Sequence, residues 1–427
     1  DMINGLVDWR LISYDQMKKT YTAHPLIKSY FESDFEERNK KLCHQRIYAY
    51  FGENAPEEAD TLEEMQPLFE QVYHGCAAGL YQQTLDEVFY AKIDKHGEHF
   101  LYQKLGAWET GLSLTKTFFP EGKLSRTPLL TDKRGQSWLL NTAGVALLNT
   151  GRPKEAEEPF LTGVKMDIEA KDWENVSVGY HNLFDLQFRT GEIESGLDSA
   201  QKALEMAEKV KGEFLIWISK VGIGWILYLL GESKEAENKF SQANELCIKD
   251  EGNQLRSLGG VQYADFLISM KRIDEALELT KQNFEICKSE NWINDISRCY
   301  RCLGAMARIK ENYLEAEKHL KEALKIARKV GMPELEIEAL LESARLNLDT
   351  QEYEDAIRDA SQALNICGRT DFIFYEPDAE IVLSKAYLAQ KDFEQAETFA
   401  NSAYEKAIGM KYRWPEGDAA HQGRIQA

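Results

Sequence analysis

The chain has 427 residues, and its 71 Asp and Glu against 51 Lys and Arg give a formal net charge of −20 at pH 7. Nucleic acids and anionic membranes require a basic surface, so this charge disfavours both as partners. The length exceeds the usual size of about 150 residues for one domain and favours several domains or an extended repeat array.

Seven cysteines, an odd number, without a recognisable secretory leader favour a reducing cytoplasm over a disulfide framework. The first residue is Asp, so we expect a fragment of a longer chain. The most apolar run, residues 214–231, contains Lys220 and is short for a membrane span, so we expect a buried helix there.

Residues 1–31 carry a short pattern of strands followed by a helix. The segments RLISYD and TYTAH predict two strands joined by a polar turn, and a helix is expected from Pro25 because proline suits a first turn. The segment AHPLIKSYF resembles the end of the winged-helix module of STAND-class signalling ATPases of the NB-ARC and NACHT kinds. In that family a His of a Met-His-Asp motif begins a helix and touches the phosphates of ADP.

The resemblance implies that His24 is a sensor of the ADP phosphate, acting only when the missing ATPase module is present. Ala23 and Pro25 stand where the family motif has Met and Asp. The alternative for His24 is an ordinary histidine at a helix start.

Residues 32–136 predict a helical arm of irregular pairs. The segment GLYQQTLDEVF, residues 79–89, resembles the turn and second helix of the repeat described next, but it is out of register. His96 and His99 form an HGEH segment without further ligands at suitable spacing, which favours a solvated turn over a metal site.

Residues 137–416 repeat with a period of 40 residues. One small residue recurs at that interval: Ala156, Gly196, Ala236, Ala276, Ala316, Ala356 and Ala396. Glycine marks the turn of the first three units at Gly151, Gly191 and Gly231, where it permits a left-handed backbone. Later units have other residues there, so this point of resemblance between the units weakens toward the C-terminus: Lys271, Glu311, Gln351 and Lys391.

This register resembles the tetratricopeptide repeat, a pair of antiparallel helices with small residues where the helices cross. The period exceeds the usual 34 residues, and the longer helices are similar to those of kinesin light chains and bacterial signalling ATPases. We therefore expect an all-α, right-handed superhelix (an α-solenoid) of about seven 40-residue helix pairs over residues 137–416. Residues 417–427 are expected to form a partial or degenerate capping helix.

Catalysis and metal binding find little support in the sequence. The chain has no nucleophile elbow, phosphate-binding loop or dinucleotide fingerprint, so we expect no enzyme activity and no cofactor in this fragment. Cys247, Cys287 and Cys367 share one repeat position with alanines of other units, which predicts small core residues. Cys299 and Cys302 have the spacing of half a zinc site, but a second pair is missing.

The resemblance implies a ligand groove lined by the first helix of each unit. The positions that line this groove in the family fall, in the first three units, on Trp138, Asn141, His181, Asp185, Arg189, Trp225 and Tyr228, and in the later units on Arg298, Arg301, Arg308, Arg345 and Lys385. Arginine presents a fork of donors suited to carboxylates, so an acidic peptide or a C-terminal carboxylate is the expected ligand. The alternative is that these arginines pair with Glu338, Asp349 and other acids of neighbouring units.

The leading hypothesis is a non-catalytic, cytoplasmic region of a STAND-like signal-transduction ATPase that senses ligands and binds proteins. In such proteins the repeat array holds the ATPase inactive until a ligand binds, and oligomerisation through the ATPase module follows. Two alternatives stay open: a free-standing adaptor or co-chaperone that binds acidic tails, and the regulatory array of an enzyme such as a caspase-like protease.

Overall fold

The computed structural model describes residues 2–17, 20–34 and 36–413. The chain divides into two compact units, residues 1–93 and residues 94–427. Residues 94–136, which the sequence analysis placed in the helical arm, therefore belong to the same unit as the repeats. The domain limits expected at residues 31, 136 and 416 stay predictions, and the expected capping segment 417–427 lies outside the described residues.

The first unit begins with the strands and the helix that the sequence predicts. After α1 (Met2–Asp8), the strands β1 (Ile12–Asp15) and β2 (Thr20–Ala23) pair antiparallel, with Ile12 opposite Ala23. Helix α2 (Pro25–Asp34) starts at the predicted proline. The winged-helix assignment itself stays a prediction.

The rest of the first unit is helical. It contains α3 (Glu37–Asn54), α4 (Leu62–Ala77), α5 (Tyr81–Thr84) and the π-helix η1 (Leu85–Ile93). A capping box begins α4: Thr61 Oγ1 accepts the backbone N–H of Glu64, and the Glu64 carboxylate accepts the backbone N–H of Thr61.

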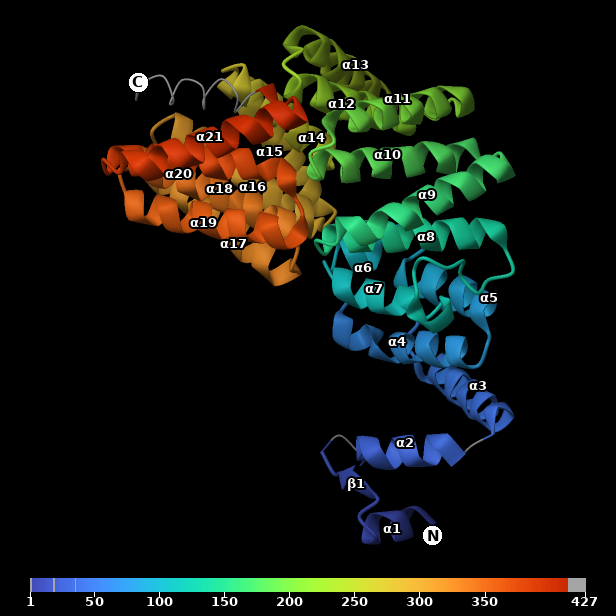
Figure 1. The fold of residues 1–427 in the computed structure, drawn as a ribbon. Helices are drawn as coiled ribbons and strands as arrows, with labels where there is room; N and C mark the ends of the chain where they lie inside the picture. Colours follow the sequence, from blue (N-terminus) through green and yellow to red (C-terminus); the bar gives the residue numbers. More distant parts are fainter. Residues whose placement is uncertain (1, 18–19, 35, 414–427) are drawn as a thin grey trace. The chain divides into compact units, whose positions relative to one another are not determined.

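The second unit is an α-solenoid (Figure 1). It begins with α6 (Phe100–Gln103), α7 (Trp108–Lys116) and the 3₁₀-helix η2 (Pro120–Gly122). Seven antiparallel helix pairs follow within the described residues, as predicted: α8 (Lys133–Asn149) and α9 (Pro153–Ala170), α10 (Trp173–Arg189) and α11 (Ile193–Val210), α12 (Glu213–Leu229) and α13 (Ser233–Glu251), α14 (Ser257–Ser269) and α15 (Ile273–Ser289), α16 (Ile293–Ile309) and α17 (Tyr313–Val330), α18 (Pro333–Asp349) and α19 (Tyr353–Thr370), and α20 (Glu376–Ala389), preceded by the 3₁₀-helix η3 (Ile373–Tyr375), and α21 (Phe393–Met410).

The small residues of the register lie where the two helices of a pair meet. Ala156, Ala236 and Ala316 are completely buried. A Cβ atom added to Gly304 would lie 2.6 Å from Leu320 of the facing helix, which is closer than side chains pack. The sequence period thus reflects a steric requirement, since the helix backbones can approach only where one side chain is small.

The turn within each pair keeps one conformation in all seven units, although glycine is replaced by other residues in the four later ones. The four later turn residues have φ angles of 58° to 66°, close to the 78° to 83° of the three glycines. The backbone hydrogen bonds are also the same. At Glu311 the N–H of the turn residue donates to Arg308 O, and the next N–H, of Asn312, donates to Ala307 O, which closes the helix end.

Replacing Lys391 by glycine is expected to raise the free energy of unfolding, by up to about 1 kcal/mol. A left-handed conformation costs an L-residue roughly 1–2 kcal/mol, and the greater freedom of glycine in the unfolded chain offsets part of this gain. The matched control is the preceding residue, Gln390, which has a φ of −79° and should lose stability as Gln390→Gly. Urea unfolding of both variants measures the difference; equal effects of the two substitutions would contradict the reasoning.

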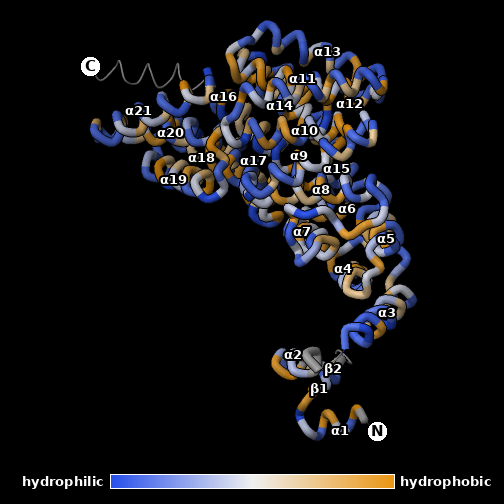
Figure 2. Tube along the Cα trace, turned by 45° about the vertical axis from the view of Figure 1, so that its right-hand side comes forward, coloured by the Kyte–Doolittle hydropathy of each residue, from blue (hydrophilic) through white to orange (hydrophobic). Residues whose placement is uncertain are grey.

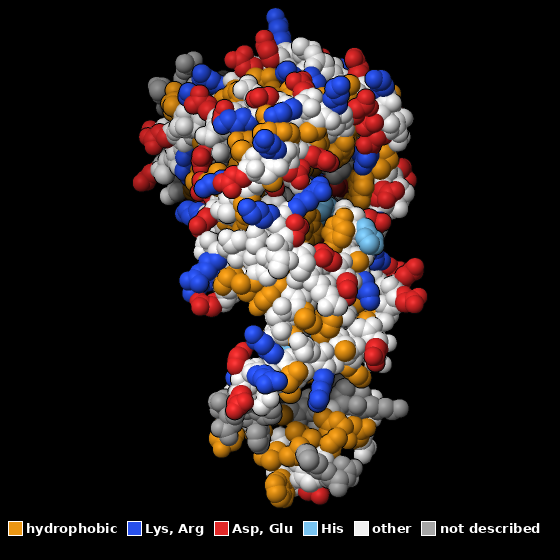
Figure 3. Space-filling view, turned by 90° about the vertical axis from the view of Figure 1, so that its right-hand side faces the viewer, with side chains coloured by type: hydrophobic (Ala, Val, Ile, Leu, Met, Phe, Trp, Pro, Cys, Tyr) orange, Lys and Arg blue, Asp and Glu red, His pale blue; other side chains and the backbone are white. Residues whose placement is uncertain are grey.

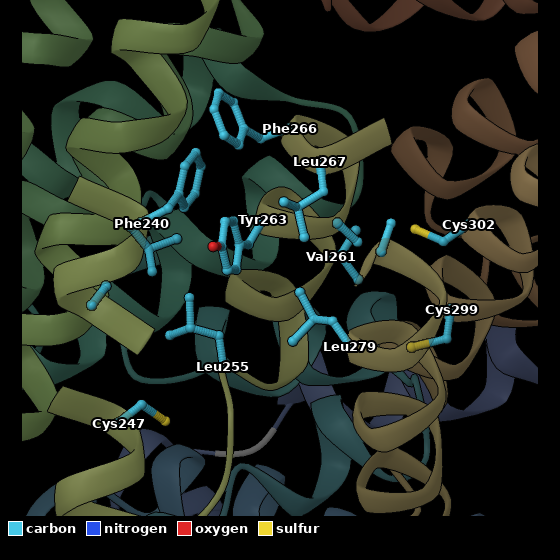
Figure 4. Packing of buried hydrophobic residues seen from close by; sticks show 14 of the residues in the cluster. Phe240, Cys247, Leu255, Val261, Tyr263, Phe266, Leu267, Leu279, Cys299 and Cys302 are labelled. Carbon is cyan, nitrogen blue, oxygen red and sulfur yellow. The ribbon is translucent and has the colours of Figure 1, made fainter. Parts of the chain in front are cut away.

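The core of the array runs between the paired helices. Figure 2 shows hydrophobic and hydrophilic residues alternating along the repeat helices, and Figure 4 shows one cluster, in which Phe240, Tyr263 and Phe266 pack together. Cys247, Cys287 and Cys367 are fully buried, which confirms them as small core residues. The apolar run at 214–231 forms α12, and none of the helices in the described part of the chain is long and apolar enough to cross a membrane.

The array of the second unit winds back on itself. Lys154 Nζ lies 3.0 Å from Asp371 Oδ1, and Lys411 Nζ lies 2.5 Å from Glu194 Oε1; each pair is separated by 217 residues of sequence. The earliest repeats therefore contact the last ones. This contact within the unit covers part of the surface that the first helices of the repeats form.

Candidate ligand pocket

A pocket of about 670 Å³ lies on the wall formed by the first helices of the repeats. Helices α12, α14, α16, α18 and α20 contribute most of its lining, together with η3 and Tyr412. Six of the residues predicted from the repeat register line it: Trp225, Tyr228, Arg301, Arg308, Arg345 and Lys385. The other predicted residues of the array do not line this pocket: Trp138, Asn141, His181, Asp185, Arg189 and Arg298.

The arginines of the pocket are held by carboxylates of neighbouring units. Arg301 forms a two-pronged ion pair with Asp265, with Nη2 2.7 Å from Oδ2. Arg308 Nε lies 2.7 Å from Glu342 Oε1, and its Nη1 lies 2.7 Å from Asp349 Oδ2. The structure thus shows the internal pairing that the sequence analysis kept as its alternative, and carboxylate recognition by these arginines stays a prediction.

Glu342 receives two of these arginines. Arg345 donates from Nη1 to Glu342 Oε2 at 3.1 Å and from Nη2 to Asp378 Oδ1 at 2.5 Å. Burial alone would raise the pKa of Glu342, but Arg308 and Arg345 lower it to about 2. This carboxylate is therefore ionised and fully engaged over the physiological pH range.

A second set of ion pairs is buried at the edge of the pocket, whose lining includes Glu334, and joins distant repeats. Arg189 of α10 is 2% exposed, and its Nε lies 2.8 Å from Glu334 Oε1 of α18. Arg298 of α16 donates to Glu334 Oε2 at 2.8 Å, and Tyr375 Oη donates to Glu334 Oε1 at 2.7 Å. Arg189 also lies 2.8 Å from Asp185. Arg189 and Arg298 were predicted to line the groove. They are instead buried in ion pairs that link distant repeats, so a ligand cannot contact them.

Glu338 differs from the other carboxylates of the pocket. Its side chain is 17% exposed, and its closest cation is Arg298 Nε, 3.7 Å from Oε2, which is too far for a hydrogen bond. Glu338 Oε2 is buried and has no hydrogen-bond partner among the described residues. Burial is the largest cause that raises the pKa of Glu338, to about 7. The sequence analysis named this residue only as a possible partner of arginine and missed its state.

The remaining predicted residues of the array have local roles. Asn141 accepts a hydrogen bond from Asn182 Nδ2 at 2.8 Å. Burial lowers the pKa of His181 to about 4, so its imidazole is neutral near pH 7. The rings of Trp225 and Tyr228 lie with their centroids 5.5 Å apart on the pocket wall.

His24 lies in the other unit, exposed at the start of α2. Its Nδ1 accepts the backbone N–H of Leu26 at 3.2 Å, so the imidazole caps the first turn of the helix. This geometry accounts for a histidine at this position by local structure, and a role toward ADP stays a prediction.

The cysteines and histidines that were considered as metal ligands have other surroundings in the structure. Cys299 and Cys302 are fully buried, and the hydrogen bond to Cys287, followed by burial, raises the pKa of Cys299 well above its ordinary value. His96 and His99 lie in an exposed turn, where His99 Nδ1 is 3.2 Å from Asp94 Oδ1. No cluster of three or more His, Cys, Asp and Glu in the described residues is arranged to hold a metal ion.

Part of the array matches a known repeat. The family model of the tetratricopeptide repeat matches residues 295–369. These residues cover α16 to α19 of the array, the part in which the pattern of small residues and Glu and Lys is clearest in the sequence. No curated protein sequence matches the chain.

Several solved structures are similar in fold. The Rap conjugation gene regulator of plasmid pLS20, in complex with the Phr* peptide, is 12% identical with a TM-score of 0.51, over 81% of this chain and 95% of that one. A Rap protein complexed with competence and sporulation factor is 13% identical with a TM-score of 0.48, over 85% and 98% of the two chains. A STAND protein with a tetratricopeptide-repeat sensor from Pyrococcus horikoshii is 14% identical with a TM-score of 0.39; this chain spans 58% of its length, and 99% of this chain is covered. At these identities the likeness is one of fold.

Proposed function

We propose that residues 94–427 form a non-catalytic peptide-binding scaffold whose ligand occupies the pocket on the first helices. The observation that carries the proposal is the pocket itself: its volume of about 670 Å³ lies within the roughly 300–1,000 Å³ typical of ligand sites. Stacked repeats present such concave surfaces to extended partners. The Rap regulator with a similar fold was solved with a peptide bound, which supports the same class of ligand here.

The lining suits a peptide more than a purely apolar molecule. Phe188, Trp225 and Phe374 provide aromatic surface, and charged side chains from α14, α16 and α18 lie beside them. An extended peptide offers both kinds of side chain together with polar backbone groups, so it can satisfy the whole lining at once.

Filling the pocket should abolish peptide binding. We expect the double variant Ile309→Trp, Leu348→Trp to place two bulky rings on the pocket wall, one at the exposed Ile309 and one at the half-buried Leu348. Peptides selected from a random heptapeptide display library on the wild-type protein should bind the double variant at least roughly tenfold more weakly, because a fully buried aromatic anchor contributes about 2 kcal/mol or more to binding.

The matched control is Leu314→Trp, since Leu314 is 84% exposed on α17 and does not line the pocket. Binding is measured by fluorescence polarisation, and circular dichroism checks that each variant is folded. Equal affinity of the double variant and the control would place the peptide site elsewhere, and failure to select any peptide would contradict peptide binding as the function.

We also infer that the chain is the regulatory part of a STAND-like signalling ATPase. The support is the order of β1, β2 and α2 in the first unit, with His24 at the helix start, together with the repeat array that follows. The sequence encoded upstream of Asp1 discriminates this reading from a free-standing adaptor: a phosphate-binding loop followed by an acidic, Mg²⁺-binding strand is expected for the ATPase. Oligomerisation would then depend on that ATPase module.

A further inference from the structure

We propose that the pocket selects a positively charged group of its peptide ligand, a Lys or Arg side chain or a free N-terminal ammonium, and that Glu338 binds that group. The inference rests on the proposed peptide-binding function and names the chemistry of the ligand. It is opposite in sign to the acidic ligand expected from the sequence.

The charges of the pocket lining do not favour an anionic ligand. Six carboxylates line the pocket against five basic side chains: Asp265, Glu334, Glu338, Glu342, Asp349 and Asp378 against Lys271, Arg301, Arg308, Arg345 and Lys385. The pocket therefore has no surplus of positive charge with which to attract a carboxylate. A cation from the ligand would balance the lining.

The ion pairs show which carboxylate is left over. Arg301 pairs with Asp265. Arg308 and Arg345 both pair with Glu342; Arg308 also pairs with Asp349, and Arg345 with Asp378. At the edge of the pocket, Arg298 donates to Glu334 and to Asp295. Glu338 keeps only the 3.7 Å approach of Arg298 Nε, so among the carboxylates of the lining it is one that a ligand could engage without breaking a close ion pair, once its side chain turns toward the pocket.

A buried carboxylate without a hydrogen bond costs stability, and a bound cation would offset that cost. Glu338 Oε2 is buried and, in the described part of the chain, without a hydrogen-bond partner, yet the residue lines the pocket. An ammonium or guanidinium group supplies the missing donors and the missing charge together. The aromatic rings of Trp225 and Tyr228 on the same wall add surfaces that attract cations.

The protonation state of Glu338 agrees with this role. Burial raises its pKa to about 7, Arg298 and Arg301 oppose this rise, and Glu334 and Asp265 add to it. A cation beside the carboxylate favours its ionised form, so binding should be weaker below pH 7. The charged and titratable groups that act on Glu338 or respond to it are Asp265 of α14, Arg298, Arg301 and Cys302 of α16, Glu334 of α18 and Tyr375 of η3.

The test uses the whole chain and a random heptapeptide display library at pH 8. Peptides selected by the wild-type protein should be enriched in Lys or Arg, and those selected by Glu338→Gln should lose that enrichment. The matched control is Glu245→Gln, which removes the same charge from an exposed position of α13. It should select the same basic peptides as the wild type.

Synthetic copies of the selected peptides distinguish the two sources of the cation. Replacing Lys or Arg by norleucine should weaken binding at least tenfold if a side chain is bound, and N-terminal acetylation should do so if the terminal ammonium is bound. Wild-type affinity should be about tenfold lower at pH 6 than at pH 8, which is the change in the ionised fraction of a group with a pKa of about 7. Glu338→Gln should remove this pH dependence.

Enrichment of Asp or Glu, or equal selection by wild type and Glu338→Gln, would overturn the inference. That outcome differs from failure of the proposed function, in which the selected peptides bind the Ile309→Trp, Leu348→Trp variant as well as they bind the wild type. Selection of no peptide would contradict both.

Discussion

Replacing Glu334 by glutamine should lower the free energy of unfolding of the repeat unit by about 3–5 kcal/mol, the cost of removing one partner of a buried ion pair. Glu334 lies between Arg189 and Arg298, both nearly inaccessible to solvent, and accepts a hydrogen bond from Tyr375. The neutral variant leaves two buried guanidinium groups with too little negative charge. Urea unfolding of the whole chain, monitored by circular dichroism, measures this loss of stability.

The adjacent carboxylate Glu336 provides the control for this substitution. It lies on the same helix, pairs with the half-exposed Arg328 and should lose less than about 1 kcal/mol as Glu336→Gln, because surface pairs contribute little. Similar losses for Glu334→Gln and Glu336→Gln would contradict the assignment.

The pH dependence of this contribution has a defined sign. Arg189 and Arg298 lower the pKa of Glu334 below its ordinary value, although burial acts in the other direction. The native state therefore holds this proton less tightly than the unfolded chain does. Its stabilising effect is present above the ordinary carboxyl pKa and is lost as the pH falls through the lowered pKa.

The repeat register could be predicted from sequence because its cause is local. The two helices of a pair approach each other closely, and this requires a small residue at each crossing point. Gly304 is an example, because a Cβ atom there would clash with Leu320. The conformation of the later turns could not be predicted in this way. Lys271 and Gln351 carry no glycine signal, but the helices on both sides impose the left-handed conformation on them.

The candidate site was predictable only in part. The period placed Arg301, Arg308 and Arg345 on the pocket wall, since equivalent residues of successive units face the same side. It could not give the pairing of Arg189 with Glu334, which depends on how far the array curves over several repeats. It also could not show that Glu338 is left without a close partner, because that depends on how the arginines divide among the acids.

Replacing Glu338 by glutamine should instead stabilise the protein at pH 8, by roughly 1–3 kcal/mol, because it removes the cost of keeping this buried carboxylate ionised. The native pKa of about 7 lies above the ordinary value of 4.5, so the native state binds this proton more tightly than the unfolded chain does. The contribution of Glu338 to the free energy of unfolding of the wild type is therefore greatest below pH 4.5, and it falls as the pH rises toward 7.

Glutamine carries no titrating proton, so the gain of Glu338→Gln over the wild type should shrink as the pH is lowered from 8 to 5. Urea unfolding at several pH values measures it, with Glu245→Gln as the control for removing one charge from this acidic chain. A gain that is the same at pH 5 and pH 8, or shared by the control, would show that general charge repulsion is responsible. A stabilised variant that has also lost its preference for basic peptides would show that the wild-type protein keeps a destabilising carboxylate at Glu338 because its ligand needs one.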